Sequence, residues 1–297
     1  MDRFHRIADA FAQVQKQACL LLETIDGAAF FSNDAWQKEI GTGITRVIAH
    51  GSKIEKGAIN FSKVSGPVTP SMEATTGISE GTFSATGVSS IFHPKNPLAP
   101  IIHMNIRYFE LSNGKAWFGG GIDLTPHYID LDEVRNFHQE LKRVCDTFDA
   151  SWYPDFKQQA DNYFFIQHRN ESRGVGGIFY DHLMADERSW EKLFDFSVDL
   201  GTLYPELYAG ILIKKGNLPY SPGQLLWQKH RRSRYVEFNL MYDRGTQFGL
   251  QSNGNVESIL VSMPPDAQWS YNYSPEPGSE EEKTMNFLKK GINWLEI

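Results

Sequence analysis

The sequence predicts an α+β fold in which a large, mostly antiparallel β-sheet is flanked by helices on both faces. Two observations lead to this prediction. Stretches rich in β-formers come in meander-like runs separated by glycine, and amphipathic helical patterns stand at both ends of the chain and between those runs. No repeat, low-complexity segment or linker interrupts the 297 residues, so one domain over 1–297 is expected.

The first half of the chain should supply most of the sheet. A helix ending near Gly27 is expected first, because apolar residues recur at helical spacing before it. Residues 36–66 then alternate short β-rich pieces with glycine breaks, as a meander does. Residues 79–100 are rich in Gly, Ser and Pro and are expected to form a long irregular loop of the kind that often carries function. Residues 101–111 alternate like a strand.

The second half should be mainly helical. A helix over 131–149 has Asp130 as its N-cap and Glu133 three positions later, which is a capping-box pattern. Further helices are expected after Pro154, over about 186–200, 205–214 and 222–232, and from Ser279 onward. The expected strands in this half are 174–181, 234–243 and 257–263.

Composition narrows the class of protein. The chain is 41% hydrophobic, enough for a sizeable core, and has neither an apolar run of about 20 residues nor a signal-peptide pattern, so no membrane span and a cytoplasmic location are expected. Cys19 and Cys145 fall in helical patterns and are expected to be buried free thiols. A net charge of −7 argues against general binding to nucleic acid, so an anionic ligand would need a local basic site, for which residues 228–235 (QKHRRSRY) are a candidate.

Residues 119–128 (GGGIDLTPHY) bring glycines next to an acid. A dinucleotide-binding fingerprint would need a third glycine at position 124, which is Leu124, and the Lys-Ser/Thr ending of a P-loop is missing. Two interpretations remain. Either the glycines only relieve crowding at a strand, or they let a bulky flat ligand approach the backbone above Asp123.

The stretch HMNIRYF places His103, Asn105 and Arg107 at alternate positions. On a strand these side chains project from one face, with apolar residues on the other. An imidazole, an amide and a guanidinium together suit an anionic, hydrogen-bonding ligand, because arginine can hold a carboxylate through two parallel hydrogen bonds. A solvated polar face without a function is the alternative. Asp123 and Thr125 would share a face in the same way.

Other chemistries have weaker support. His93, His103, His138 and His168 lack compact metal-ligand spacing, and His138 next to an apolar helix position suggests a core histidine. A Ser-His-Asp hydrolase is not indicated, because no G-x-S-x-G motif is present. A metal-dependent oxidoreductase or hydrolase using these histidines remains an alternative.

Taken together, these stretches resemble the oxygen-dependent coproporphyrinogen III oxidases over nearly the whole chain. The matching segments are 87–110 (GVSSIFHPKNPLAPIIHMNIRYFE), 117–128 (WFGGGIDLTPHY), 161–181 (DNYFFIQHRNESRGVGGIFYD), 231–250 (RRSRYVEFNLMYDRGTQFGL) and 257–265 (ESILVSMPP). The resemblance implies a homodimer with a flat antiparallel sheet and a cleft above it. It also implies oxidative decarboxylation of two propionates of coproporphyrinogen III to vinyl groups, giving protoporphyrinogen IX for haem synthesis. Dioxygen is the oxidant, and no flavin, haem or nicotinamide cofactor is required.

The resemblance also assigns roles to individual residues. Ser89 corresponds to a substrate contact and His103 to a proton donor. The segment Asn105, Ile106 and Arg107 corresponds to a substrate-binding segment, and Asp123 corresponds to an acid that acts on the pyrrole nitrogens. On this interpretation Asp123 is a carboxylate on the floor of the cleft, and Arg107 anchors a propionate.

Two features leave questions open. This chain has Asn253, Gly254 and Asn255 where the family usually has Gly-Gly-Arg or Gly-Ser-Arg, so a guanidinium is missing from a substrate-binding segment. Either a neighbouring basic residue compensates, or neutral hydrogen bonds hold that propionate. A non-catalytic tetrapyrrole carrier is a second alternative function.

Bacterial relatives are described with a divalent metal on histidines that match His93, His103, His138 and His168, whereas eukaryotic relatives are described as metal-free.

Overall fold

The computed structural model describes residues 2–68, 81–251 and 255–297, and its centre is an antiparallel sheet of seven strands. The strands in spatial order are β1 (Ser32–Lys38), β2 (Gly41–Ala49), β3 (Ile54–Pro67), β4 (Thr82–Pro94), β5 (Ile101–Leu111), β6 (Ala116–Thr125) and β9 (Gly177–Met184). From β1 to β6 each strand pairs with the next one in the chain, which confirms the predicted meander. A separate small hairpin, β7 (Phe165–Ile166) and β8 (Glu171–Ser172), flanks a short helix, η1 (Gln167–Arg169).

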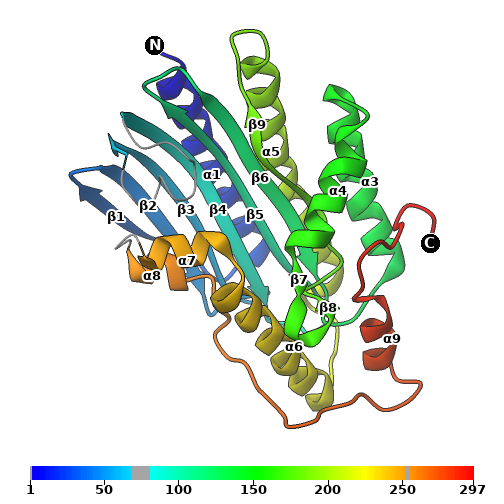
Figure 1. Ribbon diagram of the computed structural model, residues 1–297. Helices are drawn as coiled ribbons and strands as arrows, with labels where there is room; N and C mark the ends of the chain where they lie inside the picture. The colour runs from blue at the N-terminus through cyan, green and yellow to red at the C-terminus, as the bar shows by residue number, and fades with distance from the viewer. Residues whose placement is uncertain (1, 69–80, 252–254) are drawn as a thin grey trace.

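Helices cover both faces of this sheet, as predicted (Figure 1). One face packs against α1 (Arg3–Asp26) and α5 (Trp190–Lys215), and the other carries α6 (Pro222–Met241), α7 (Arg244–Gln251) and α8 (Val256–Leu260). At the β9 edge lie α3 (Leu131–Phe148) and α4 (Trp152–Tyr163), and α9 (Glu280–Phe287) comes near the C-terminus. In the described part of the chain, no helix combines the length and apolarity needed to cross a membrane.

The alternation of β5 separates the two faces. Met104, Ile106 and Tyr108 are fully buried in the main core, which α1 and α5 share. Ile101, at an odd position, instead packs in a smaller cluster with Tyr235 of α6. The odd positions of β5 therefore face α6, which fixes where His103, Asn105 and Arg107 must lie.

The prediction of an irregular loop over 79–100 was wrong for most of that range. β4 occupies Thr82–Pro94 and pairs with β3 on one side and β5 on the other. Its Ser and Gly residues disfavour a strand in isolation, but two neighbouring strands satisfy its backbone groups. Thr86 and Ser90 also bond outside the strand, to the carbonyl of Ser62 and the hydroxyl of Tyr204.

Two helices predicted over 186–200 and 205–214 are one continuous helix, α5. Pro205 lies inside it, where it removes one backbone hydrogen bond and costs about 3 kcal/mol. The helix continues because its flanks are deeply packed. Gly201, four residues before the proline, lies so close to Val14 and Ile106 that an added Cβ would be 2.9 Å and 3.0 Å from them.

The strands predicted over 234–243 and 257–263 were also wrong, because α6 continues to Met241 and α8 is helical. Tyr235 and Phe238 in α6 and the C-cap residue Tyr242 recur with helical spacing as well, so the short segment fits both periods. Packing of Tyr235 onto the sheet favours the helix.

Most local signals were confirmed. Gly27 ends α1 with φ of 75°, Asp130 accepts a hydrogen bond from the backbone N–H of Glu133, and Ser279 accepts one from that of Glu282. The strand expected over 174–181 is β9, which begins at Gly177. Cys19 and Cys145 are buried free thiols, and burial raises their pKa values to about 11 and about 12.

Candidate active site

A polar face on the sheet forms the candidate site, and we define it by Ser89, His103, Asn105 and Arg107. Ser89 of β4 pairs directly with Asn105 of β5, so the two side chains lie side by side, and Ser89 is exposed. The predicted alternation of the His103, Asn105 and Arg107 positions is confirmed. Ile106 belongs to the same sequence segment, but its side chain is buried in the core on the opposite face.

Asp123 lies beneath His103. The two residues pair across β5 and β6, and the Nδ1 of His103 lies 2.9 Å from the Oδ1 of Asp123. The side chain of Asp123 is only 2% exposed, so its carboxylate is not an open acid on the floor of a cleft. It is the cross-strand neighbour of the imidazole on the same face of the sheet.

Arg173 is the buried partner of Asp123, and the sequence analysis missed it. One terminal nitrogen of Arg173 donates to both oxygens of Asp123, at 2.8 Å and 2.7 Å. The guanidinium lies against the rings of Phe164, Tyr235 and Phe238, 4.5–4.7 Å from their centroids. The segment containing Arg173 precedes β9, which pairs with β6, and this pairing brings Arg173 to a residue 50 positions away.

The charge state of Asp123 follows from these contacts. Burial opposes ionisation of a carboxyl group, but the positive charge of Arg173 and the hydrogen bond from His103 outweigh it and lower the pKa of Asp123 below its usual value. An ionised Asp123 can only accept hydrogen bonds, so Nδ1 of His103 carries the proton of this bond. The other ring nitrogen, Nε2, then carries the lone pair of the neutral imidazole.

Arg107 lies at the side of this group. One nitrogen donates to the Oδ1 of Asn105 at 3.3 Å, and another lies 2.8 Å from the Oδ1 of Asp181 in β9. The Arg107 side chain remains 41% exposed. Such an arginine is oriented but still open to a carboxylate from solution.

The three glycines before Asp123 make room for the protein's own groups. A Cβ on Gly119 would lie 2.7 Å from the Nε of Arg107, and one on Gly120 would lie 2.7 Å from the hydroxyl of Tyr180. A Cβ on Gly121 would lie 2.6 Å from the carbonyl oxygen of Ile178. Neighbouring strands and the Arg107 guanidinium therefore occupy the space that was expected to admit a flat ligand. This supports the interpretation that the glycines relieve crowding within the sheet.

The four histidines considered for a metal do not converge among the described residues. His138 is bonded to the Tyr153 hydroxyl and the Val175 carbonyl, and His168 to Tyr242 and Glu237. His93 bonds to the carbonyl of Ser262, and His103 bonds to Asp123. In the part of the chain that the structure describes, no group of three or more His, Cys, Asp or Glu side chains is arranged to hold a metal ion. These four histidines therefore do not fit one ion.

The basic stretch 228–235 is not an open anion site. It lies in α6, and its arginines are largely buried and paired with carboxylates: Arg231 with Glu171, Arg232 with Glu55 and Asp266, and Arg234 with Glu237. These ion pairs fasten α6 to the rest of the protein. The segment 253–255 differs from the family pattern noted above. Asn253 and Gly254 lie outside the described residues, and Asn255 is the N-cap residue of α8.

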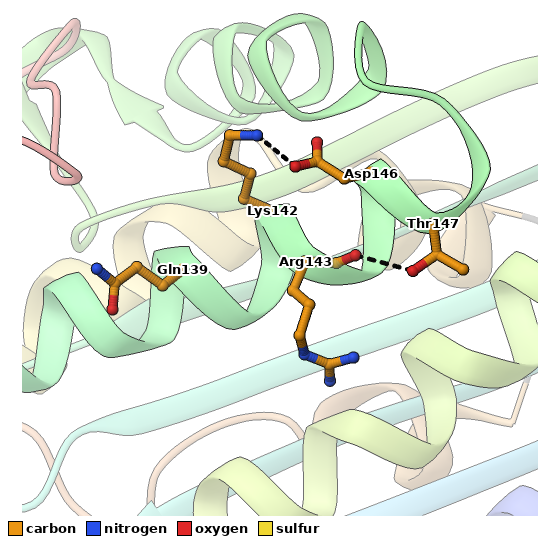
Figure 2. Close-up of a pocket in the computed structure, with 5 residues that line it drawn as sticks. All are labelled: Gln139, Lys142, Arg143, Asp146 and Thr147. Carbon is orange, nitrogen blue, oxygen red and sulfur yellow. Dashed lines mark hydrogen bonds and ion pairs between the residues drawn. The ribbon is translucent and has the colours of Figure 1, made fainter.

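A surface depression on α3 is separate from the polar face. Figure 2 shows it lined by Gln139, Lys142, Arg143, Asp146 and Thr147, all from this one helix. Lys142 and Asp146 form an ion pair across it. It brings together no group that suits catalysis.

Comparison with known proteins gives a consistent result. Residues 6–294 match the family described as coproporphyrinogen III oxidase. An oxygen-dependent coproporphyrinogen-III oxidase of Francisella philomiragia is 43% identical over 303 residues, covering 97% of each chain. The chloroplastic oxygen-dependent coproporphyrinogen-III oxidase of Glycine max is 42% identical over 306 residues, covering 98% of this chain and 79% of the relative.

The buried His138 provides a test that needs no substrate. Burial lowers the pKa of His138 to about 3, whereas the pKa of a histidine in an unfolded chain is about 6.5. Between these values the unfolded chain binds the extra proton, so the free energy of unfolding increases with pH and is lost as pH falls. For His138 alone the loss from pH 7 to pH 5 is about 2 kcal/mol.

We therefore expect His138→Gln to show a pH dependence of unfolding that is smaller by about 2 kcal/mol over this range, measured by urea denaturation. His5→Gln replaces a histidine whose side chain is 52% exposed and is the control. Equal pH dependence in His138→Gln and the parent protein would contradict the buried neutral state.

Proposed function

This chain belongs to the coproporphyrinogen III oxidase family, and from that premise we propose that it converts coproporphyrinogen III to protoporphyrinogen IX with dioxygen. The propionates on rings A and B become vinyl groups. For each one, –CH2–CH2–COOH and O2 give –CH=CH2, CO2 and hydrogen peroxide, so that O2 takes the two electrons. The observation that carries this proposal is the partly exposed polar face. On it, His103 is bonded to the buried Asp123–Arg173 ion pair and lies on the same strand as Arg107, whose side chain is 41% exposed.

Arg107 binds a propionate in this proposal. Its guanidinium lies against Gly119 and is bonded to Asn105 and Asp181, so it is already oriented. A bound carboxylate fixes which part of the flexible substrate lies over His103, and positioning of this kind lowers the barrier to reaction. Ser89 and Asn105 supply neutral hydrogen bonds on the same face.

His103 is the proposed catalytic residue. Its Nε2 exchanges a proton with the reacting group and passes it to reduced oxygen. Asp123 is a positioning residue that acts through His103, because its carboxylate is buried and holds Nδ1 in the protonated form. Arg173 keeps Asp123 ionised, and it donates to both oxygens, including the Oδ1 that also accepts from His103. In this assignment Asp123 supports the imidazole instead of touching the pyrrole nitrogens.

No flavin, haem, nicotinamide or metal cofactor is required in this proposal, and O2 is the co-substrate. The sequence agrees, since it lacks a dinucleotide fingerprint and a P-loop. A single domain over 1–297, a cytoplasmic location and the absence of nucleic-acid partners remain predictions from the sequence.

We also propose a homodimer. Exposed apolar side chains occur at the end of α6 and on α7 and α8, namely Leu240, Met241, Leu250 and Val256. Burial of such residues in a subunit interface is favourable. A monomer by light scattering at working concentration would contradict the dimer.

The function is tested with coproporphyrinogen III prepared anaerobically and then supplied with air. We expect vinyl products to form both with and without a chelator, and chromatography measures them. If chelation abolishes the oxygen-dependent activity and an added metal restores it, the metal-dependent alternative would be favoured. Binding of substrate without vinyl product would favour the carrier.

Asp123→Asn tests the positioning role. We expect kcat to fall by about a hundredfold or more, because the amide no longer enforces the Nδ1–H form of His103, while KM changes much less. The substitution leaves Arg173 buried without its partner charge, so stability should also fall by about 3–5 kcal/mol.

The control for that loss is Glu133→Gln, which removes one charge of the Lys215–Glu133 pair between α3 and α5. It should reduce stability but keep kcat per folded molecule. Near-normal kcat in folded Asp123→Asn would remove Asp123 from the mechanism.

A further inference from the structure

His182 lies at an irregularity of the sheet, next to the acid that holds Arg107. The pairing of β6 with β9 shifts its register here, so that two residues, Asp181 and His182, oppose a single residue of β6 in a β-bulge. On either side of the bulge, Tyr180 and Leu183 pack in or against the main core. The extra residue therefore places the side chains of both Asp181 and His182 on the face that carries Arg107.

The backbone of His182 has an unusual conformation that its contacts maintain. Its φ is 51°, in the left-handed region that residues other than glycine seldom occupy. The imidazole stacks on the indole of Trp117, with the ring centroids 5.0 Å apart and the planes 17° from parallel. The backbone N–H of His182 donates to the Oδ1 of Asp181 at 2.9 Å. Unfavourable backbone of this kind persists where the surrounding structure requires a particular side-chain position.

The imidazole and Arg107 meet at the same carboxylate oxygen. The Nδ1 of His182 lies 3.3 Å from the Oδ1 of Asp181, and a nitrogen of Arg107 lies 2.8 Å from that oxygen. In the described part of the chain, the other charged group beside this carboxylate is Arg244, 3.7 Å from the Oδ2. Burial opposes ionisation of Asp181, but the charges of Arg107, His182 and Arg244 lower its pKa below the usual value. Asp181 is therefore a carboxylate at neutral pH.

His182 is the member of this group whose charge can change near neutral pH. The arginines stay charged and Asp181 stays ionised, whereas histidine is the side chain that ordinarily gains a proton between about pH 8 and about pH 5. The side chain of His182 is 51% exposed, so water can supply that proton. Once protonated, the imidazole attracts the oxygen that Arg107 also contacts. Two cations then share one acceptor, and Arg107 is held less tightly.

We propose that His182 is a pH-dependent positioning residue for Arg107: when protonated, it takes a share of the Asp181 carboxylate and leaves the Arg107 guanidinium freer to bind a propionate. This inference rests on the proposed function, in which Arg107 binds a propionate of the substrate. It requires no contact between His182 and the substrate. Its consequence is that affinity for a propionate-bearing ligand increases as pH falls through the range in which His182 gains its proton.

The test measures the Kd for coproporphyrin III, the oxidised form that retains all four propionates, by fluorescence titration at about pH 6 and about pH 8. His182→Asn removes the titratable ring and introduces a residue that tolerates a positive φ. His50→Asn is the matched control, because His50 is also an exposed histidine with a positive φ, 58°, and lies between β2 and β3. Titration of the ligand itself is common to all variants, so each is compared with the parent.

We expect the ratio of Kd at the higher pH to Kd at the lower pH to be about threefold or more larger in the parent than in His182→Asn. His50→Asn should match the parent. With coproporphyrinogen III, the KM of His182→Asn should change with pH as its Kd does, while its kcat at each pH stays within about threefold of the parent value. Equal Kd ratios in the parent and in folded His182→Asn would overturn the role of His182.

The route through Asp181 is tested in an Asp181→Asn background. There Arg107 has already lost its partner charge, so adding His182→Asn should no longer alter the Kd ratio. An effect as large as in the parent background would contradict the proposal, because the imidazole would then act on the ligand directly. Parent protein that binds coproporphyrin III but makes no vinyl product would refute the proposed function, and the Kd ratios would still decide the role of His182.

Discussion

The buried ion pair between Asp123 and Arg173 is the interaction on which the candidate site depends. Two charges with almost no exposure are costly to bury unless each satisfies the other, and here both oxygens of the acid accept from one arginine nitrogen. Aromatic rings around Arg173 exclude water from the pair. The pair fixes a negative charge behind His103, and this charge determines which ring nitrogen is protonated.

The fold supplies the partners from separate parts of the chain. β5 carries His103, β6 carries Asp123, and Arg173 precedes β9, which pairs with β6. Helix α6 adds Tyr235 and Phe238 to the wall around Arg173. On the opposite face of β5, Met104 and Ile106 hold the strand in the main core. One strand therefore joins a rigid apolar layer to a partly exposed polar face.

The sequence predicted what depends on local periodicity. Strand alternation placed His103, Asn105 and Arg107 on one face, and capping residues placed the ends of α1, α3 and α9. It did not predict Arg173, since nothing in local spacing links that residue to Asp123 across the chain. The strand-like pattern after Arg234 became helix because contacts of Tyr235 with the sheet decide between two periods that the residues themselves fit equally well. The glycines before Asp123 were correctly separated from a phosphate loop, but only the structure shows that Arg107, Tyr180 and Ile178 occupy the space beside them.

The central claim is that Asp123 acts through His103 by holding its Nδ1 proton. The most direct measurement is the nitrogen NMR spectrum of protein labelled with 15N in the histidine rings, with the His103 signals assigned from a His103→Gln sample. At a pH where His103 is neutral, we expect a protonated Nδ1 and an unprotonated Nε2. A protonated Nε2 with an unprotonated Nδ1 would contradict the claim, because Asp123 would then accept no hydrogen bond from the imidazole.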